Sequence, residues 1–471
     1  MQRDNDMHRE KESGYPGDVA SLPLDERTDD RLLEDKNEHE REDEQEDELP
    51  RADDILTIVF TADNHLGSTA FGVSPQKREQ RAHRLRRAFQ QATDFAIGQG
   101  VDLFIQGGDL FDTPNPDERD RSFVAERLAQ LKQANVRALA IGGFHDMPIA
   151  DASLDRIAPQ QSYARLGALH YFAPAENIEP LFLTIRGMLI GIGASGAGAG
   201  SAAVGDPLAH LKVNSRIERA AISLLLLHAP IEGISSGTQP ALSRSVSQSS
   251  IESQNAFRYI LAGYSHLYQR RRLGKNELIV AGATGHIDFS LQADDRSEQA
   301  PGFVFLGIAP DGLRWCKHIE VDSLRLRRLV IDASDLWANL DTSPTESILA
   351  RLRPLASLDT LLQLCLQGEL PRHQYHQLDL NQIRRYGEQH CFALAIDDSG
   401  LSLLPDHKEA GADAEQAASW GGLQRLSPRL ELLALVEEEI AATRDEQEKR
   451  ALQITREELL IALDEVKGRS I

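Results

Sequence analysis

The chain has 471 residues, of which 41% are hydrophobic and 26% are charged, and its formal net charge at pH 7 is −22. A chain of this length exceeds one ordinary domain, so we expect a sizeable core and at least two structural units. No apolar run approaches the length of a membrane span and the acidic N-terminus is unlike a signal peptide, which excludes membrane partners and favours a cytoplasmic protein.

Residues 1–54 form the first segment and are the most acidic part of the chain. They contain 21 Asp or Glu residues against 8 Lys or Arg residues. Such a segment has too little apolar surface to offset its ordering entropy, so we expect a disordered acidic tail. A solvated tail is a better interpretation than a specific acidic docking arm. The three cysteines, Cys316, Cys365 and Cys391, are odd in number and widely separated, which is typical of a reducing compartment.

Residues 55–320 alternate between short apolar runs and amphipathic stretches. The runs predict buried strands that lead into loops. They are ILTIVFTADNH (55–65), VDLFIQGGD (101–109), VRALAIGGFHD (136–146), ISLLLLHAP (222–230) and YILAGYSH (259–266). Residues 77–100 and 118–135 separate the first three runs and have helical periodicity. Strand, helix and strand in succession predict a layered α/β core.

A smaller unit is expected over residues 321–404. Its predicted strands are RLRRLVID, TLLQLCLQGEL and HCFALAID, and its predicted helices are PTESILARLRPLA and LNQIRRYGEQ. Residues 405–424 have the composition of a linker. Residues 425–471 begin with Ser427 and Pro428, which suit the N-cap and first turn of a helix, and we expect a C-terminal helical segment.

Each of the five strand-like runs in residues 55–320 ends in groups that can bind a metal. These are Asp63 and His65, Asp109 and Asp112, His145 and Asp146, His228, and His266. A lone His or Asp in such a place is usually a loop or turn residue, but the carboxyl ends of neighbouring parallel strands face one crevice. Carboxylates and imidazoles without cysteine suit Mn²⁺, Fe²⁺ or Zn²⁺ and argue against a structural zinc site. A pair of such ions is the usual arrangement for phosphoester hydrolysis.

The motifs at these strand ends resemble those of the calcineurin-like metallophosphoesterases. In order they are DNHLG (63–67), GDLFD (108–112), GFHD (143–146), His228 and GYSH (263–266). The first two are similar to those of the nuclease subunit (SbcD) of the bacterial SbcCD DNA double-strand-break repair complex and its archaeal and eukaryotic relatives. Residues 280–308 and 361–380 resemble later segments of those nucleases. The resemblance covers residues 55–400 and implies a layered sheet sandwich flanked by helices, with a small α+β capping domain.

The resemblance also implies a role for each strand-end residue. One metal would be held by a complete set of four residues, Asp63, His65, Asp109 and His266. Asp109 would bridge to a second metal, to which His228 belongs. His145 would protonate the leaving oxygen or stabilise the transition state, and Asp146 would orient it. Mn²⁺ is the favoured ion.

The second metal site departs from the family pattern at two positions. The family has Asn where Phe144 stands and His where Tyr264 stands, and both missing groups are ligands. Phe144 cannot coordinate a metal, and Tyr264 could do so only as a phenolate, whose formation requires a pH near 10. Both replaced ligands belong to the second site, while the first site keeps all four of its residues, which suggests a coordinated change. The clamp that two metal ions form on the phosphate would be weakened.

Two functions from different classes follow from these expectations. The first is a metal-dependent phosphodiesterase, a DNA exonuclease or endonuclease of DNA repair with reduced activity. The second is a catalytically impaired or inactive DNA-binding or regulatory subunit of a repair complex. Hydrolysis of a small phosphodiester is disfavoured by the nuclease-like capping domain. The expected partners are DNA and a coiled-coil ATPase similar to SbcC, which the C-terminal helices would contact; the same helices could instead form a homodimer or pack on this chain.

Overall fold

A computed structural model describes residues 54–71, 74–147, 157–174, 177–196, 206–209, 211–234, 245–289, 300–336, 343–404, 436, 440 and 449–456. The acidic tail, except Asp54, and the whole 405–424 linker lie outside these residues. Of the expected C-terminal segment only residues 436, 440 and 449–456 are described, and all of them are helical. No described helix has the length and apolar character needed to cross a membrane.

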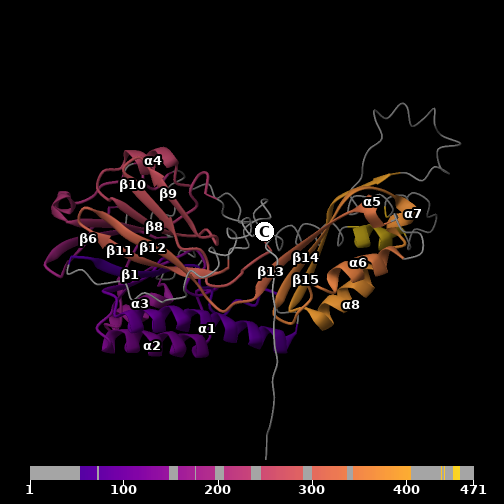
Figure 1. Ribbon diagram of the computed structural model, residues 1–471, viewed down its shortest axis with the longest axis horizontal. Coiled ribbons are helices and arrows are strands. Elements are labelled where there is room, and N and C mark those ends of the chain that lie inside the picture. The colour runs from indigo at the N-terminus through magenta and orange to yellow at the C-terminus, as the bar shows by residue number, and fades with distance from the viewer. Residues whose placement is uncertain are drawn as a thin grey trace, which may run out of the picture. The chain divides into compact units, whose positions relative to one another are not determined.

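Two six-stranded sheets and one three-stranded sheet make up the described part of the chain (Figure 1). The first sheet has the order β12 (Gly312–Glu320), β11 (Gly302–Ala309), β1 (Leu56–Thr61), β2 (Leu103–Gln106), β3 (Arg137–Ile141), β4 (His170–Phe172). The second has the order β5 (Leu181–Ile185), β6 (Met188–Ser195), β7 (Ile222–His228), β8 (Tyr259–Gly263), β10 (Asn276–Val280), β9 (Gln269–Leu273). In the first sheet β1 to β4 are parallel, β11 is antiparallel to β1, and β12 is antiparallel to β11. In the second sheet β6, β7, β8 and β10 are parallel, and the edge strands β5 and β9 are antiparallel to their neighbours.

The two large sheets pack face to face, and their central strands are buried on both faces. In β7, Leu224 and Leu226 join the core between the sheets, while Leu225 and Leu227 join a second core on the outer face. Alternate side chains of a strand point to opposite faces, so a continuous apolar run fits a strand that is covered on both sides. The uninterrupted run of leucines is thus explained by its central place in the sandwich.

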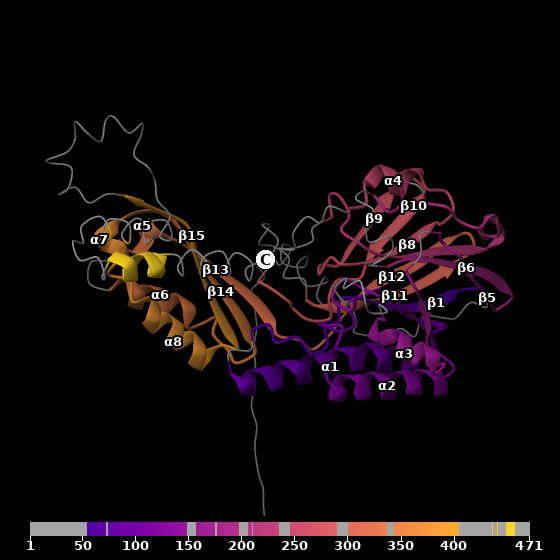
Figure 2. The ribbon, with the colours of Figure 1, turned by 180° about the vertical axis from the view of Figure 1, so that it is seen from behind.

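Helices cover the outer faces of this sandwich. The long helices α1 (Pro75–Gln99) and α2 (Glu118–Gln133) lie along the first sheet, and α4 (Gln248–Ser253) lies on the second (Figures 1 and 2). Helix α1 begins at the N-cap Ser74 and ends at Gly100, whose φ of 52° is the left-handed conformation that glycine adopts readily. The short α3 (Pro159–Arg165) and the 3₁₀ helix Ser215–Arg219 complete this region. The expected layered sheet sandwich flanked by helices is therefore confirmed.

The third sheet belongs to residues 325–404 and is parallel throughout. Its order is β13 (Arg325–Asp332), β14 (Thr360–Pro371), β15 (Ala393–Leu404), and its helices are α5 (Ala333–Leu336), α6 (Pro344–Leu352), α7 (Arg372–Tyr375) and α8 (Leu380–His390). The apolar faces of α6 and α8 share a core with the strands. All three predicted strands and both predicted helices of this region are present, while the boundary at residue 320 stays a prediction.

Candidate metal centre

The predicted site residues come from both large sheets. Asp63 and His65 follow β1, Asp109 follows β2, and His145 and Asp146 follow β3, all in the first sheet. His228 is the last residue of β7 and His266 follows β8, both in the second sheet. The strand-end motifs had suggested the edge of one open sheet. The carboxyl ends of two packed sheets meet instead, which is why five loops reach a common point.

The loops after β1 and β2 are tied together by backbone hydrogen bonds. The N–H of Asp63 donates to the carbonyl of Gly108, and the N–H of His65 donates to the carbonyl of Asp109, each at 3.0 Å. Asp63, His65, Asp109 and Tyr264 all have positive φ, between 45° and 87°. This conformation is uncommon for residues other than glycine and clusters at functional sites, where the surrounding contacts enforce it.

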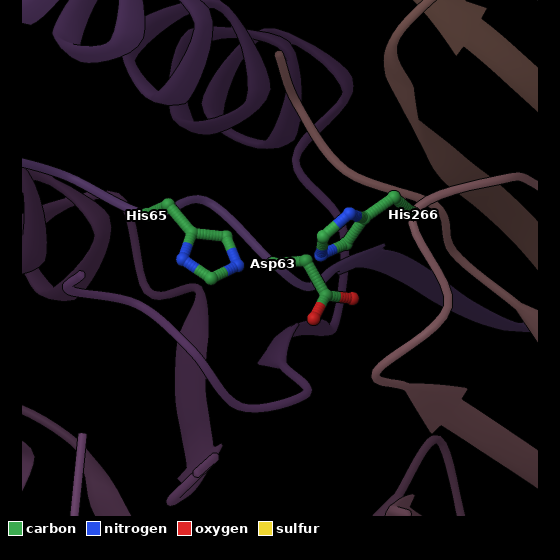
Figure 3. A group of neighbouring side chains, drawn as sticks. All are labelled: Asp63, His65 and His266. Atoms are coloured by element: carbon green, nitrogen blue, oxygen red, sulfur yellow. The ribbon is translucent and has the colours of Figure 1, made fainter. Parts of the chain in front are cut away.

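Three overlapping groups of these side chains could hold a metal ion. They are Asp63, His65 and His266; His65, Asp109 and His145; and Asp63, Asp109 and His228, each with ligand atoms within 4.8 Å of one another. In the first group the imidazoles of His65 and His266 approach Asp63 from opposite sides (Figure 3). The groups share members, so they describe one continuous cluster centred on Asp63, His65 and Asp109.

The orientation of two imidazoles fits a metal ion at this cluster. His228 holds its Nδ1 2.8 Å from the carbonyl of Gly107, and His65 holds its Nδ1 2.9 Å from the carboxylate of Asp112. A carbonyl can only accept, so Nδ1 of His228 carries a proton, and the carboxylate favours the same for His65. The Nε2 atoms of both rings and Oδ2 of Asp109 are buried without a hydrogen-bond partner among the described residues.

Lone pairs that meet in this way destabilise a site unless a proton or a metal ion lies between them. Nε2 of His228 is 3.2 Å from Oδ2 of Asp109, and Nε2 of His65 is 3.9 Å from the same oxygen. Neither contact meets hydrogen-bond geometry. The donor set, two imidazole nitrogens and a carboxylate oxygen, is the chemistry that borderline divalent ions prefer. The residues therefore fit a divalent metal.

Electrostatics within the cluster pair acid with base. Burial alone would lower the pKa of His228, but the ionised Asp109 beside it raises that pKa to about 9. Burial would raise the pKa of Asp109, and the neighbouring His228 and His65 hold it well below its usual range instead. In the absence of a metal, a proton on His228 takes the place of the positive charge that the cluster requires.

Two further candidate ligands, Asp63 and His65, also have displaced pKa values. Burial raises the pKa of the Asp63 carboxyl, although His228 and His266 oppose the shift. For His65, burial works toward a lower pKa, and the hydrogen bond to Asp112 and the charge of Asp109 outweigh it, so the pKa rises. A buried cluster with several displaced pKa values is typical of a functional site.

His145 lies at the open side of the cluster. Its side chain is 43% exposed, and its backbone N–H donates to Oδ1 of Asp109 at 2.8 Å. Its ring packs edge-on against His65, with 4.6 Å between the ring centroids, and its Nδ1 lies 3.3 Å from the carbonyl of Asp112. The imidazole is therefore held beside the buried ligands while it remains accessible from solvent.

The described contacts of Asp146 include backbone groups of the neighbouring loops. Its carboxylate accepts hydrogen bonds from the backbone N–H groups of Leu110, Phe111 and Gly143, at 3.0 to 3.2 Å. None of its described hydrogen bonds goes to the ring of His145. Burial and the nearby Asp109 raise its pKa to about 6. Asp146 thus joins the loop after β2 to the loop after β3, and its role in orienting His145 stays a prediction.

Phe144 and Tyr264 form an aromatic group with His228. The ring centroid of Phe144 lies 5.7 Å from that of His228 and 5.5 Å from that of Tyr264. Tyr264 is buried, and its backbone N–H donates to both oxygens of Asp63 at 3.1 Å. Burial and the charges of Asp109 and Asp63 raise the pKa of its phenol to about 12, so the hydroxyl stays protonated at neutral pH.

Two carboxylates that support the ligands were not assigned this role from the sequence. Asp112 accepts the hydrogen bond from His65, and Asp288 has its Oδ2 3.7 Å from Nδ1 of His266. Asp112 was considered only as a candidate ligand, and it belongs to none of the three groups. The position of Asp112 in GDLFD was a usable signal, but its partner could not be identified without the fold.

Comparison with known proteins identifies the region that carries this centre. Residues 56–268 match the calcineurin-like phosphoesterase family. The chain is 31% identical over 94 residues to the DNA double-strand break repair protein Mre11 of Saccharolobus solfataricus, which is 20% of this chain and 23% of that protein. It is 31% identical over 112 residues to the protein of the same name from Methanosarcina mazei, which is 24% of this chain and 17% of that protein.

A bacterial relative shows a similar degree of likeness. The chain is 29% identical over 94 residues to the uncharacterized metallophosphoesterase YhaO of Bacillus subtilis, which is 19% of this chain and 23% of that protein. The matches thus span about a quarter or less of the length of these curated relatives. The ordered motifs, the sheet sandwich and the family match agree: this chain contains a calcineurin-like metallophosphoesterase domain, and Mre11 proteins are among its relatives.

Proposed function

We propose that the protein is a metal-dependent phosphodiesterase that cleaves DNA. The observation that carries this proposal is the convergence of buried Nε2 atoms of His65 and His228 on Oδ2 of Asp109, at 3.9 and 3.2 Å. A divalent metal ion bound there supplies a Lewis acid for a phosphoryl oxygen and lowers the pKa of a water molecule. DNA as the substrate is supported by the likeness to relatives named as DNA double-strand break repair proteins.

The side chains divide into ligands and a proton donor. Asp63, His65, Asp109 and His266 hold the ion in this proposal. His145, exposed beside them, donates a proton to the leaving oxygen or binds the phosphoryl group as it gains charge, for which an imidazole near neutral pH is suited. The hydrogen bond from its backbone N–H to Asp109 holds His145 beside the ligands.

We propose further that the centre holds one ion tightly, with Mn²⁺ the favoured metal. At the second position only Asp109 and His228 remain of the family's ligands, together with the nearby Asp63. The Phe144 ring stands beside His228 and offers no ligand atom. One ion places less positive charge beside the phosphoryl group than two ions do. The rate of hydrolysis is therefore lower than in a two-metal enzyme.

A second function is favoured by the same substitutions. If the single ion does not suffice for hydrolysis, the protein is a DNA-binding or regulatory subunit of a repair complex. A coiled-coil ATPase is the proposed partner of the C-terminal segment, and a homodimer is the competing assembly. Size-exclusion chromatography with light scattering on the full chain distinguishes a dimer from a monomer.

Metal analysis coupled to DNA cleavage tests the enzyme against the subunit. Purified wild-type protein is assayed for metal content and for Mn²⁺-dependent cleavage of single- and double-stranded DNA, beside Asp109→Ala. We expect about one ion per wild-type chain, measurable cleavage, and loss of both in Asp109→Ala. The exposed Glu179→Gln is the control and should match wild type. Wild-type protein that binds DNA but shows no cleavage beyond Asp109→Ala would support the subunit instead.

A further inference from the structure

Phe144 is unusual among the apolar side chains of the described residues. Five large hydrophobic side chains are exposed there, and Phe144, at 37%, is the aromatic one. It is also the one beside the metal centre, since the buried ring of His228 is its neighbour. A single exposed apolar side chain needs no explanation by itself. Phe144 differs from the other four because it stands beside the buried candidate ligands, where it can contact a molecule bound there.

Hydrogen bonds of the residues before and after Phe144 hold its backbone in place. The N–H of the preceding residue, Gly143, donates to Asp146 at 3.0 Å, and the N–H of the following residue, His145, donates to Asp109 at 2.8 Å. A side chain on Gly143 would collide with Asp109, because a Cβ there would lie 2.1 Å from its Oδ1. Buried carboxylates therefore fix the backbone on either side of Phe144, and the rings of His228 and Tyr264 support the phenyl group.

A rigid, partly exposed ring is suited to one kind of ligand contact. Bases of single-stranded nucleic acids stack on aromatic side chains, and the contact tolerates any base because each has a flat π-face. A base within a duplex has both faces covered by its neighbours, whereas an unpaired base has a face to offer. No hydrogen-bonding group of Phe144 is available to read a base edge, so the contact would be independent of sequence.

We propose that Phe144 is a stacking platform for an unpaired nucleobase close to the phosphate at the metal centre. The inference rests on the proposed function and makes it more specific, because it names single-stranded or frayed DNA as the preferred substrate. In this view the phenyl group does more than occupy the place of a metal ligand. It replaces part of the lost metal-phosphate binding with base stacking.

Abasic scanning tests this role on the wild-type protein. Short fluorescent single strands, each with one abasic residue at a different position, are titrated on ice with Mn²⁺ present, and strand integrity is checked afterwards. We expect one position at which loss of the base weakens binding about tenfold. Abasic residues elsewhere in the strand should have little effect, and the effect should not depend on which base is removed.

Variants then assign the effect to Phe144. Phe144→Leu keeps an apolar side chain but has no π-face. It should bind the intact strand about tenfold more weakly than wild type does, and it should bind the abasic strand as tightly as wild type does. Phe144→Trp should retain the preference for the intact strand. Leu166→Ala removes another exposed apolar side chain and should change nothing. Metal content, measured on each variant, should equal that of wild type because none of these changes adds or removes a ligand.

The outcomes separate this inference from the proposed function. Equal binding of intact and abasic strands by wild type overturns stacking and leaves DNA cleavage standing. An equal loss of affinity for the intact and the abasic strand in Phe144→Leu also overturns stacking, since the effect of the ring would then not depend on the base. Failure of wild type to bind or cut any DNA overturns the proposed function itself.

Discussion

At the residue scale, Asp109 organises the candidate metal centre. One of its oxygens accepts the N–H of His145 at 2.8 Å, and the other faces the Nε2 atoms of His228 and His65. The imidazoles are aimed at it by their own partners, the carbonyl of Gly107 and the carboxylate of Asp112. We propose that Phe144 and Tyr264, beside His228, limit the number of ions that this arrangement holds.

The double variant Phe144→Asn with Tyr264→His should bind a second metal ion. It restores the amide and the imidazole that the family has at these positions, next to the retained Asp109 and His228. We expect the metal content to rise from about one to about two ions per chain, and Mn²⁺-dependent cleavage to increase at least tenfold. Elemental analysis and a DNA cleavage assay provide the measurements. An unchanged metal content in a folded double variant would show that these positions do not limit the second site.

Asp112→Ala should weaken metal binding although Asp112 lies outside the three candidate ligand groups. The change removes the acceptor that holds Nδ1 of His65 at 2.9 Å. Loss of such a supporting group typically reduces metal affinity about 10- to 100-fold. Asp112→Asn retains an acceptor oxygen and should recover part of the affinity in calorimetric titrations with Mn²⁺. Equal affinities of wild type and Asp112→Ala would contradict this role.

At the scale of elements, the loops after β2 and β3 are joined by one buried side chain. Asp146 accepts three backbone N–H groups, from Leu110, Phe111 and Gly143, and it has no solvent exposure. Buried N–H groups left without an acceptor are costly, so the carboxylate stabilises both loops at once. The position of Asp109 and of His145 depends on this junction.

Asp146→Ala should lower the free energy of unfolding by about 3 kcal/mol, because three buried N–H groups lose their acceptor. Urea denaturation followed by circular dichroism measures the change. Glu179→Gln, at an exposed position, is the matched control and should stay within about 0.5 kcal/mol of wild type. A stability close to wild type for Asp146→Ala would mean that water or a rearranged loop satisfies these groups.

At the scale of the whole molecule, the candidate metal centre lies between loops from the two large sheets. Asp63, His65 and Asp109 belong to the first sheet, and His228 and His266 belong to the second. A shared ion would link the sheets beyond what their apolar core achieves. Ligand binding to the folded state alone also stabilises it by mass action.

Removal of metal should therefore lower the melting temperature of the wild-type protein. With the ion at a hundred times its Kd, binding contributes about 2.7 kcal/mol, which corresponds to roughly 5 °C for a domain of this size. Differential scanning fluorimetry with and without a chelator measures the shift. Asp109→Ala should show no shift on addition of the chelator, and an equal shift in both proteins would point to a metal bound elsewhere.

Much of the fold and site could be predicted because the strong signals are local. The apolar runs that became β1, β2, β3, β7 and β8 each carry strand length and a polar end in a few consecutive residues. Other strands were not predicted, among them β5 and β6 at residues 181–195 and the edge pair β11 and β12. These strands lack ligand-bearing ends, and their pairing depends on partners far away in the chain, such as β1 for β11.

By itself, the sequence determined which residue types stand at the strand ends, since this follows from residue identity and order. The interruption of the family's ligand pattern by Phe144 and Tyr264 stays a prediction from the resemblance. Only the tertiary structure decided that these ends come from two packed sheets, that Asp112 orients His65, and that Asp146 binds backbone amides and not the ring of His145. The physical reason is that coordination and hydrogen bonding require particular atoms within about 3 Å of one another. Residue order does not encode such distances between loops from different sheets; the packing of the sheets creates them.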